Sequence, residues 1–254
     1  MEKCWANSLG DCGRGLTREH LVSRCVFPDR VLTVSGLDFC GTTSKQVHID
    51  SLTAKILCGV HNNRLGEEID PVGGELFAAL RLFAQRQIDQ ADFPNLKWMP
   101  MIHLVNAPKL ERWFLKTMLG MSFRQKIIIG PGKSDIGQIP ADLVRIAFGL
   151  EKFTEGRGLY IAFKGKESFT LEDRFHYTGK LVGENLLMGY FSIHGLRFYL
   201  NLESAGNAVF RTIEDSQVFY REAHFVQLPP MNGRDAISSS TRSNSLFIQK
   251  LSIS

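Results

Sequence analysis

The spacing of apolar residues indicates short strands in the first part of the chain. Apolar positions suit a strand within 16–27 that leads into a turn. Clearer short strands are expected at 31–34, which ends at Ser-Gly, and at 47–50, where apolar and polar residues alternate. The period then changes, and residues 51–60 carry apolar side chains at helical spacing. We therefore expect strands followed by a helix in this part.

The middle of the chain carries the clearest helical pattern. Residues 62–70 predict a helix that continues or restarts after a proline, and in 74–90 the apolar residues recur at i, i+3, i+4 and i+7. A further helix is expected at 108–119, with proline at its start and Gly120 just past its end. An apolar face also predicts a helix at 140–153.

Strand patterns return after the last of these helices. Segments 159–163, 186–193 and 196–202 are rich in Leu, Ile, Phe and Tyr, and 217–228 is expected to supply a last strand. Residues 238–254 begin with a run of serines and are expected to be a mobile tail. The pattern as a whole predicts an α+β protein with helices before an antiparallel sheet.

Composition excludes several classes of protein. The chain of 254 residues is 44% hydrophobic and 22% charged, which is ordinary globular usage. It holds no run of about 18 apolar residues, so no membrane-spanning helix and no membrane partner are expected. The first residues lack an apolar signal region. We expect a cytoplasmic protein.

Charge is distributed unevenly along the chain. Residues 1–75 hold 8 Lys and Arg against 10 Asp and Glu, whereas the remaining residues hold 22 against 16. The excess in the second part permits contact with nucleic acid without specifying it.

The cysteines are clustered near the start of the chain. All five lie in the first 58 residues, and an odd number without a secretory context argues against a disulfide framework. Cys58 and His61 have the spacing of half a zinc knuckle, whereas Cys4 and Cys12 are more widely spaced than usual. These four residues are the candidate ligands of a structural zinc ion. Cys40 competes with Cys4 for one position.

Adjacent acidic and imidazole side chains suggest hydrolytic chemistry. Phosphodiester hydrolysis needs a base that activates water and a cation that stabilises the leaving oxygen, and Glu19-His20 supplies groups for both. Asn62 follows His61 directly, so a zinc knuckle would hold its amide in place. The amide oxygen could then join the Glu19 carboxylate on one hard cation.

The order of these residues resembles the HNH endonuclease superfamily. More narrowly, the Arg-Glu-His segment and the Leu-Cys-x-x-His-Asn-Asn block are similar to those of bacterial HNH proteins, over residues 4–70. The resemblance implies a ββα-metal fold around a catalytic divalent ion, expected to be Mg²⁺. By position it makes His20 the general base, and Glu19 and Asn62 the ligands of that ion. It also assigns a structural zinc ion to Cys4, Cys12, Cys58 and His61.

The expected organisation follows from this resemblance. Residues 1–90 would form the HNH nuclease domain with its zinc, 91–237 an α+β domain that positions DNA or binds a partner protein, and 238–254 the tail. The expected function is metal-dependent hydrolysis of DNA phosphodiester bonds. Stand-alone HNH proteins of this size resemble components of phage defence or mobile elements, which suggests a partner protein of such a system by analogy.

Some features leave alternatives open. The middle Asn of the family has no clear counterpart and would fall near Ser51 or Thr53, and Asn63 is an alternative to Asn62 as ligand. A catalytically weak, zinc-stapled adaptor for nucleic acid or protein is therefore a rival interpretation, as is a structural subunit of a larger complex. Arg18 and Arg64 flank the site and are candidate phosphate contacts.

Overall fold

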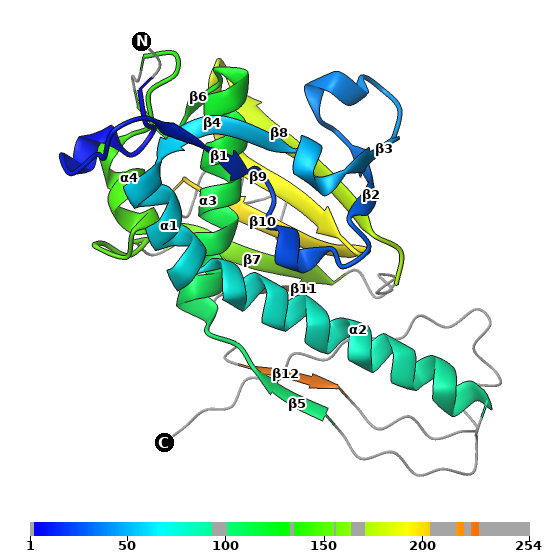
Figure 1. Ribbon diagram of the computed structural model, residues 1–254. Coiled ribbons are helices and arrows are strands. Elements are labelled where there is room, and N and C mark those ends of the chain that lie inside the picture. Colours follow the sequence, from blue (N-terminus) through cyan, green and yellow to red (C-terminus); the bar gives the residue numbers. More distant parts are fainter. Residues whose placement is uncertain are drawn as a thin grey trace, which may run out of the picture.

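A computed structural model gives the fold of the chain. It confirms the α+β class, with helices and largely antiparallel sheets (Figure 1). No helix in the described part of the chain is long and apolar enough to cross a membrane. The structure describes residues 3–92, 101–132, 135–154, 156–163, 171–203, 217–220 and 225–228.

The N-terminal part contains a two-stranded sheet followed by a helix. Strand β1 (Leu16–His20) pairs antiparallel with β4 (Thr53–Cys58), and α1 (Gly59–Glu68) begins immediately after β4. A short 3₁₀ turn, η1 (Asn7–Leu9), precedes β1. This order of strand, strand and helix agrees with the expected ββα arrangement.

The helix expected at 51–60 is wrong, because β4 occupies most of this segment. Ala54 and Ile56 are buried while Lys55 between them is exposed, so the segment alternates as a strand does. Leu57 and Cys58 are buried as well, and this run of apolar residues at the end of the strand imitates helical spacing. Pairing with a strand distant in sequence decides the outcome, and local periodicity does not reveal it.

A long insertion separates the two strands of this sheet. It contains the 3₁₀ turn η2 (Arg24–Val26), the strands β2 (Val31–Ser35) and β3 (Lys45–His48), and between and after them the turns η3 (Asp38–Cys40) and η4 (Ile49–Ser51). Both short strands were expected, although β3 begins two residues earlier than predicted, and the structure pairs them as an antiparallel hairpin.

The second sheet has eight strands and spans both halves of the chain. Its strand order is β11 (Gln217–Tyr220), β7 (Gly158–Phe163), β10 (Leu196–Asn201), β9 (Asn185–Ile193), β8 (Arg174–Val182), β2 and β3, with β6 (Ile128–Ile129) paired to β9. All pairs are antiparallel except β2 with β8 and β6 with β9. The expected strands at 159–163, 186–193 and 196–202 are confirmed, and β8 adds one that the pattern did not indicate.

Helix α3 (Ala107–Gln125) is the central packing element. It runs between the β1–β4 pair and the large sheet (Figure 1). Phe114 stacks against Phe191 and Phe198 of the sheet. The helix continues past Gly120, which was expected to end it, and at this position it packs against Ile56 of β4.

The other helices agree in position with the sequence pattern. Helix α2 (Asp70–Asp92) begins one residue before the proline, as is favourable for a first turn, and α4 (Ala141–Ala147) is shorter than expected. A last small sheet pairs β5 (Met101–Leu104) with β12 (Phe225–Leu228), so the segment expected as one strand contributes two, β11 and β12.

One apolar core serves the described chain. It combines side chains from β1, β4 and α1 with side chains from α3, α4 and the large sheet. The sheet and the core therefore run across the expected division near residue 90. Residues 93–100, where the chain was expected to break, and the expected tail at 238–254 lie outside the described residues. The division into domains stays a prediction.

Candidate metal centre

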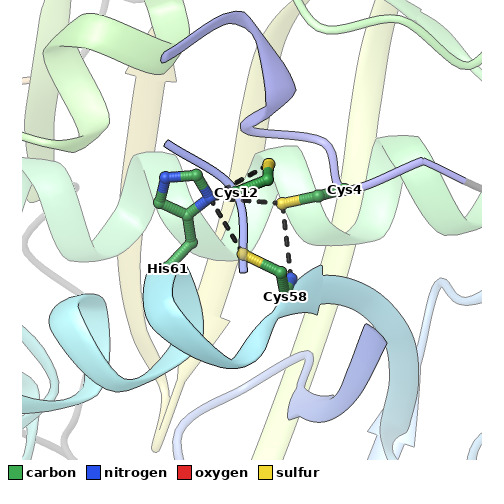
Figure 2. A group of neighbouring side chains, drawn as sticks. All are labelled: Cys4, Cys12, Cys58 and His61. Atoms are coloured by element: carbon green, nitrogen blue, oxygen red, sulfur yellow. Dashed lines mark hydrogen bonds between the residues drawn. The ribbon is translucent and has the colours of Figure 1, made fainter. Parts of the chain in front are cut away.

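Four side chains converge at one end of the β1–β4 pair. Cys4 and Cys12 come from the loops before β1, Cys58 ends β4, and His61 lies in the first turn of α1. Their ligand atoms all lie within 4.8 Å of one another, and Figure 2 shows the three sulfurs around one ring nitrogen. Cys4, Cys58 and His61 are buried, and Cys12 closes the cluster from the solvent side.

The distances within the cluster suit tetrahedral zinc. The Nδ1 atom of His61 lies 3.4 Å from the sulfur of Cys4, 3.7 Å from that of Cys12 and 3.3 Å from that of Cys58. Zinc bound to sulfur at about 2.3 Å and to nitrogen at about 2.0 Å in a tetrahedron would separate the nitrogen from each sulfur by about 3.5 Å. The cluster is therefore a Cys3His site that can bind a metal such as zinc.

Asp11 orients the imidazole of the cluster. Its Oδ1 lies 2.7 Å from Nε2 of His61, which places the ring proton on Nε2 and leaves the lone pair of Nδ1 facing the sulfurs. A carboxylate on the far nitrogen is a usual partner of metal-bound histidine, because it fixes the tautomer and raises the basicity of the ligand. Asp11 was not among the residues expected in the site, and the short loop between Cys4 and Cys12 gave no signal for it.

The three thiols lie close enough together to affect one another's pKa. Burial raises the pKa of Cys4, and burial together with the charges of the other two cysteines raises the pKa of Cys12 to about 12. For Cys58, burial also acts upward, but hydrogen bonds from the backbone amides of His61 and Gly13 lower its pKa overall. Three thiolates in one place need a cation, which a bound metal would supply.

The competing ligand Cys40 does not belong to this cluster. Its sulfur lies 3.6 Å from the carbonyl oxygen of Val34, within the β2–β3 region. Cys4 occupies the contested position, and its sulfur also accepts a hydrogen bond of 3.4 Å from the backbone N–H of Cys58.

Phe148 covers the metal centre and joins it to the rest of the protein. Phe148 comes directly after α4 in the chain. Its ring packs against His61 and Trp5, with distances between ring centroids of 5.1 Å and 5.9 Å. The guanidinium of Arg64 on α1 also lies over the Phe148 ring, 5.3 Å from its centroid. A metal bound by the N-terminal loops would therefore stabilise the packing of α4 as well.

Glu19 lies in a different, buried cluster. It is 6% exposed, and its carboxylate lies 2.5 Å from Nζ of Lys116 on α3. The same ammonium lies 2.8 Å from Asp70 at the start of α2, and Asp70 accepts a hydrogen bond from Ser23. Burial lowers the pKa of Lys116, but the two carboxylates raise it overall, so the lysine stays charged. Trp113 donates to Ser23 and completes the network.

His20 faces the opposite side of β1 from Glu19, as neighbours on a strand do. Its Nε2 lies 3.3 Å from Oδ1 of Asp50, and the second oxygen of Asp50 lies 3.4 Å from Nδ1 of His48. The hydrogen bond to His20 lowers the pKa of Asp50, which is ionised as a result. Asp50 lies beside Ser51, where the middle residue of the expected motif would fall.

Asn62 contacts the same strand from α1. Its Nδ2 donates to Oγ1 of Thr17 at 3.0 Å and to the carbonyl oxygen of Arg18 at 3.1 Å. These bonds tie the first turn of α1 to β1 and leave the amide oxygen of Asn62 without a hydrogen-bond partner among the described residues.

The expected ligands of Mg²⁺ do not fit such an ion in this arrangement. The Glu19 carboxylate is bound to Lys116 inside the protein, whereas the amide of Asn62 on α1 is hydrogen-bonded to Thr17 and to the backbone of Arg18. Within the described part of the chain, the Cys3His cluster is the one group of three or more His, Cys, Asp or Glu ligands that converge. The magnesium site stays a prediction without structural support.

The two arginines expected to contact phosphate differ in their surroundings. Arg64 is engaged by Glu68 at 3.1 Å and by Phe148. Arg18 is exposed on β1 directly opposite Lys55 of β4, and neither has an acidic partner among the described residues. Arg18 is the better placed of the two for an anionic ligand.

The residues missed from the sequence are the partners of the expected ones. Lys116 and Asp50 carry ordinary charged side chains, and their contacts depend on packing between distant segments. A charged residue on the otherwise apolar face of α3 was a usable signal for Lys116, because a buried lysine requires a partner.

No protein-family model, no curated protein and no solved structure matches this chain.

Proposed function

We propose that the chain is an HNH-type endonuclease that hydrolyses DNA phosphodiester bonds, with His20 as general base and the Cys3His cluster as a structural zinc site. The observation that carries this proposal is the β1–β4–α1 unit. The cluster fixes the start of α1, and Asn62 in its first turn hydrogen-bonds to the strand that carries His20. Metal ligands and candidate base are thus held in one compact substructure.

His20 has the surroundings that a general base needs. Its side chain is one-third exposed, and Asp50 accepts the proton on Nε2, which leaves the lone pair of Nδ1 free to take a proton from water. The carboxylate also stabilises the imidazolium that forms. Arg18 and Lys55 on the same face of the sheet supply positive charge for a phosphodiester.

The zinc site would contribute stability rather than chemistry. Its four protein ligands fill a tetrahedron and leave no position for water or substrate, which is the arrangement of structural sites. Zinc there would neutralise the thiolates and hold the loops before β1 against α1.

The ion pair of Glu19 with Lys116 favours a second candidate. A carboxylate already neutralised inside the protein is not presented to a catalytic ion. The chain would then be a zinc-stapled adaptor that binds nucleic acid without cutting it. In that case DNA binding would persist without cleavage under any divalent metal.

The test is cleavage of plasmid and oligonucleotide DNA with Mg²⁺, Mn²⁺ or no added metal. We expect His20→Ala to reduce cleavage about 100-fold or more, since general bases contribute rate factors of this order. His48→Ala is the matched control, because it removes a neighbouring imidazole and keeps the pair of His20 with Asp50. Equal activity of wild type and His20→Ala, or no cleavage by either, would reject the endonuclease.

A further inference from the structure

A basic groove lies beside the candidate base. It has a volume of about 1100 Å³ and runs over the outer face of the β1–β4 pair toward the end of α3. Asp50, the partner of His20, lies at its edge. Its cationic lining consists of Lys3, Arg18, Lys55, Arg124 and Lys126.

The charges of this groove are unbalanced. None of its five cations has an acidic partner within salt-bridge distance in the described part of the chain, and Asp50 is the one acidic residue of the lining. Arg18 and Lys55 are direct cross-strand partners. Like charges placed opposite each other destabilise a sheet, so this pair favours an anion that bridges it.

Part of the groove wall is apolar. Phe123 near the end of α3 is partly buried against the core, and Ile136 in the following loop is 68% exposed. An exposed apolar wall beside several cations suits an extended single strand, whose phosphates can contact the cations while an unstacked base contacts the apolar side chains. A duplex keeps the faces of its bases inside the stack and would leave this wall unused.

We propose that the groove binds single-stranded nucleic acid, with phosphates at the five cations and a base against Phe123 and Ile136. This inference rests on the proposed function for the identity of the anion, and it adds the strandedness of the substrate. The strand would pass Asp50 and thus bring a phosphodiester to His20. Binding and cleavage are separable, so each proposal can fail without the other.

The test is binding of a fluorescein-labelled single-stranded oligonucleotide and of the matching duplex, measured by fluorescence anisotropy without divalent metal over a range of salt. The wild type should bind the single strand at least about tenfold more tightly than the duplex, since base stacking contributes only to the former. Tighter binding of the duplex would overturn the proposal.

A double variant in the groove and a double control variant outside it extend this test. Lys55→Gln with Arg124→Gln should weaken single-strand binding about tenfold or more and reduce the slope of log affinity against log salt by about 1.4, because each lost phosphate contact removes about 0.7. Lys109→Gln with Lys152→Gln changes the net charge equally outside the groove and should bind as the wild type does. An equal loss of single-strand affinity in both double variants would indicate attraction by net charge alone and would overturn the proposed groove site.

The exposed wall residue gives the sharpest distinction. Ile136→Ser removes apolar surface from an exposed position without disturbing the core, so it should weaken single-strand binding several-fold and leave duplex binding unchanged. Unchanged single-strand binding would contradict the stacking wall. If the groove variants lose binding while wild type never cleaves, the groove stands and the endonuclease fails. If the wild type cleaves DNA and the groove variants cleave it equally well, the endonuclease proposal stands and the groove proposal fails.

Discussion

Two polar clusters border the β1–β4 pair, one on the buried side of β1 and one at the end of β4, and they differ in the source of their positive charge. Around Glu19 and Asp70 the protein supplies its own cation, Lys116, which lies within 2.8 Å of both carboxylates. Around Cys4, Cys12 and Cys58 it supplies an oriented imidazole and no permanent cation. The first cluster is electrostatically nearly complete, whereas the second is complete only when a metal is bound.

This difference decides which of the expected metal sites the structure supports. In the sequence, Glu19 and Cys58 are both candidate metal ligands. The fold separates them, because one side of β1 packs on a buried lysine and the end of β4 opens into a pocket of sulfurs.

Loss of one zinc ligand should have the largest effect. Cys58→Ser removes a buried ligand, and structural zinc contributes roughly 10 kcal/mol of apparent binding energy in small domains, so we expect loss of most of the stability of the N-terminal unit. Thermal unfolding followed by circular dichroism measures it. Cys25→Ser, which removes an exposed cysteine outside the cluster, is the control and should unfold as the wild type does. Equal melting of both variants would contradict a structural metal.

Removal of the internal cation, Lys116, should have the second-largest effect on stability. Lys116→Met leaves the buried Glu19 and the partly buried Asp70 without their counter-ion, which should cost about 3–5 kcal/mol of unfolding free energy. Urea unfolding measures this loss. Adding Glu19→Gln to Lys116→Met should recover part of it, because one uncompensated charge is then absent. A double variant no more stable than Lys116→Met would show that the carboxylate is not the source of the cost.

A third buried ionisable group, His194, lies in the turn between β9 and β10, beside the ion pair of Arg81 with Asp173. Burial, together with the charge of Arg81, lowers the pKa of His194 to about 4, so the folded protein keeps this side chain neutral. Below its ordinary pKa of about 6.5, the unfolded chain binds a proton that the folded chain rejects. Stability should therefore fall by about 3 kcal/mol as the pH decreases from about 6.5 to about 4, and stay level above that window.

His194→Asn isolates this contribution. Asparagine tolerates the left-handed backbone of this position, where φ is +50°, and has no group that titrates here. The variant should be less stable at neutral pH but lose less stability on acidification, as measured by urea unfolding at several pH values. If the unfolding free energy of the variant falls with pH in parallel with that of the wild type, other groups cause the acid sensitivity.

The orienting carboxylate should give the smallest effect. Asp11→Ala removes the partner of His61 at Nε2 and keeps all four ligands, so zinc affinity should fall about 10- to 100-fold while binding persists. Competition with a chromophoric chelator measures the affinity. An affinity equal to that of the wild type would show that the contact at 2.7 Å does not act on the metal site.

The zinc ligands were predictable from sequence because their side-chain types are specific. Few side chains other than cysteine and histidine bind zinc, and the spacing of Cys58 and His61 already specifies half of a site. The partners of Glu19 and His20 were not predictable in this way. Asp50 and Lys116 are common residues whose roles depend on which distant segments pack together.

The fold shows the same division between local and distant information. The amphipathic helix α2 and the hairpin of β9 with β10 follow from patterns within single segments. Strand β4 was expected as a helix, since its pairing with β1 bridges a long insertion. The parallel pairing of β2 with β8, which brings both halves of the chain into one sheet, has no signal in either strand alone.

Metal analysis of freshly purified protein tests directly whether the Cys3His cluster holds zinc. We expect about one zinc per wild-type chain, as a single four-ligand site requires, and almost none in Cys58→Ser. Wild-type protein that contains less than about half an equivalent of zinc after purification without chelators, and takes up none when zinc is added, would show that the cluster is not a zinc site.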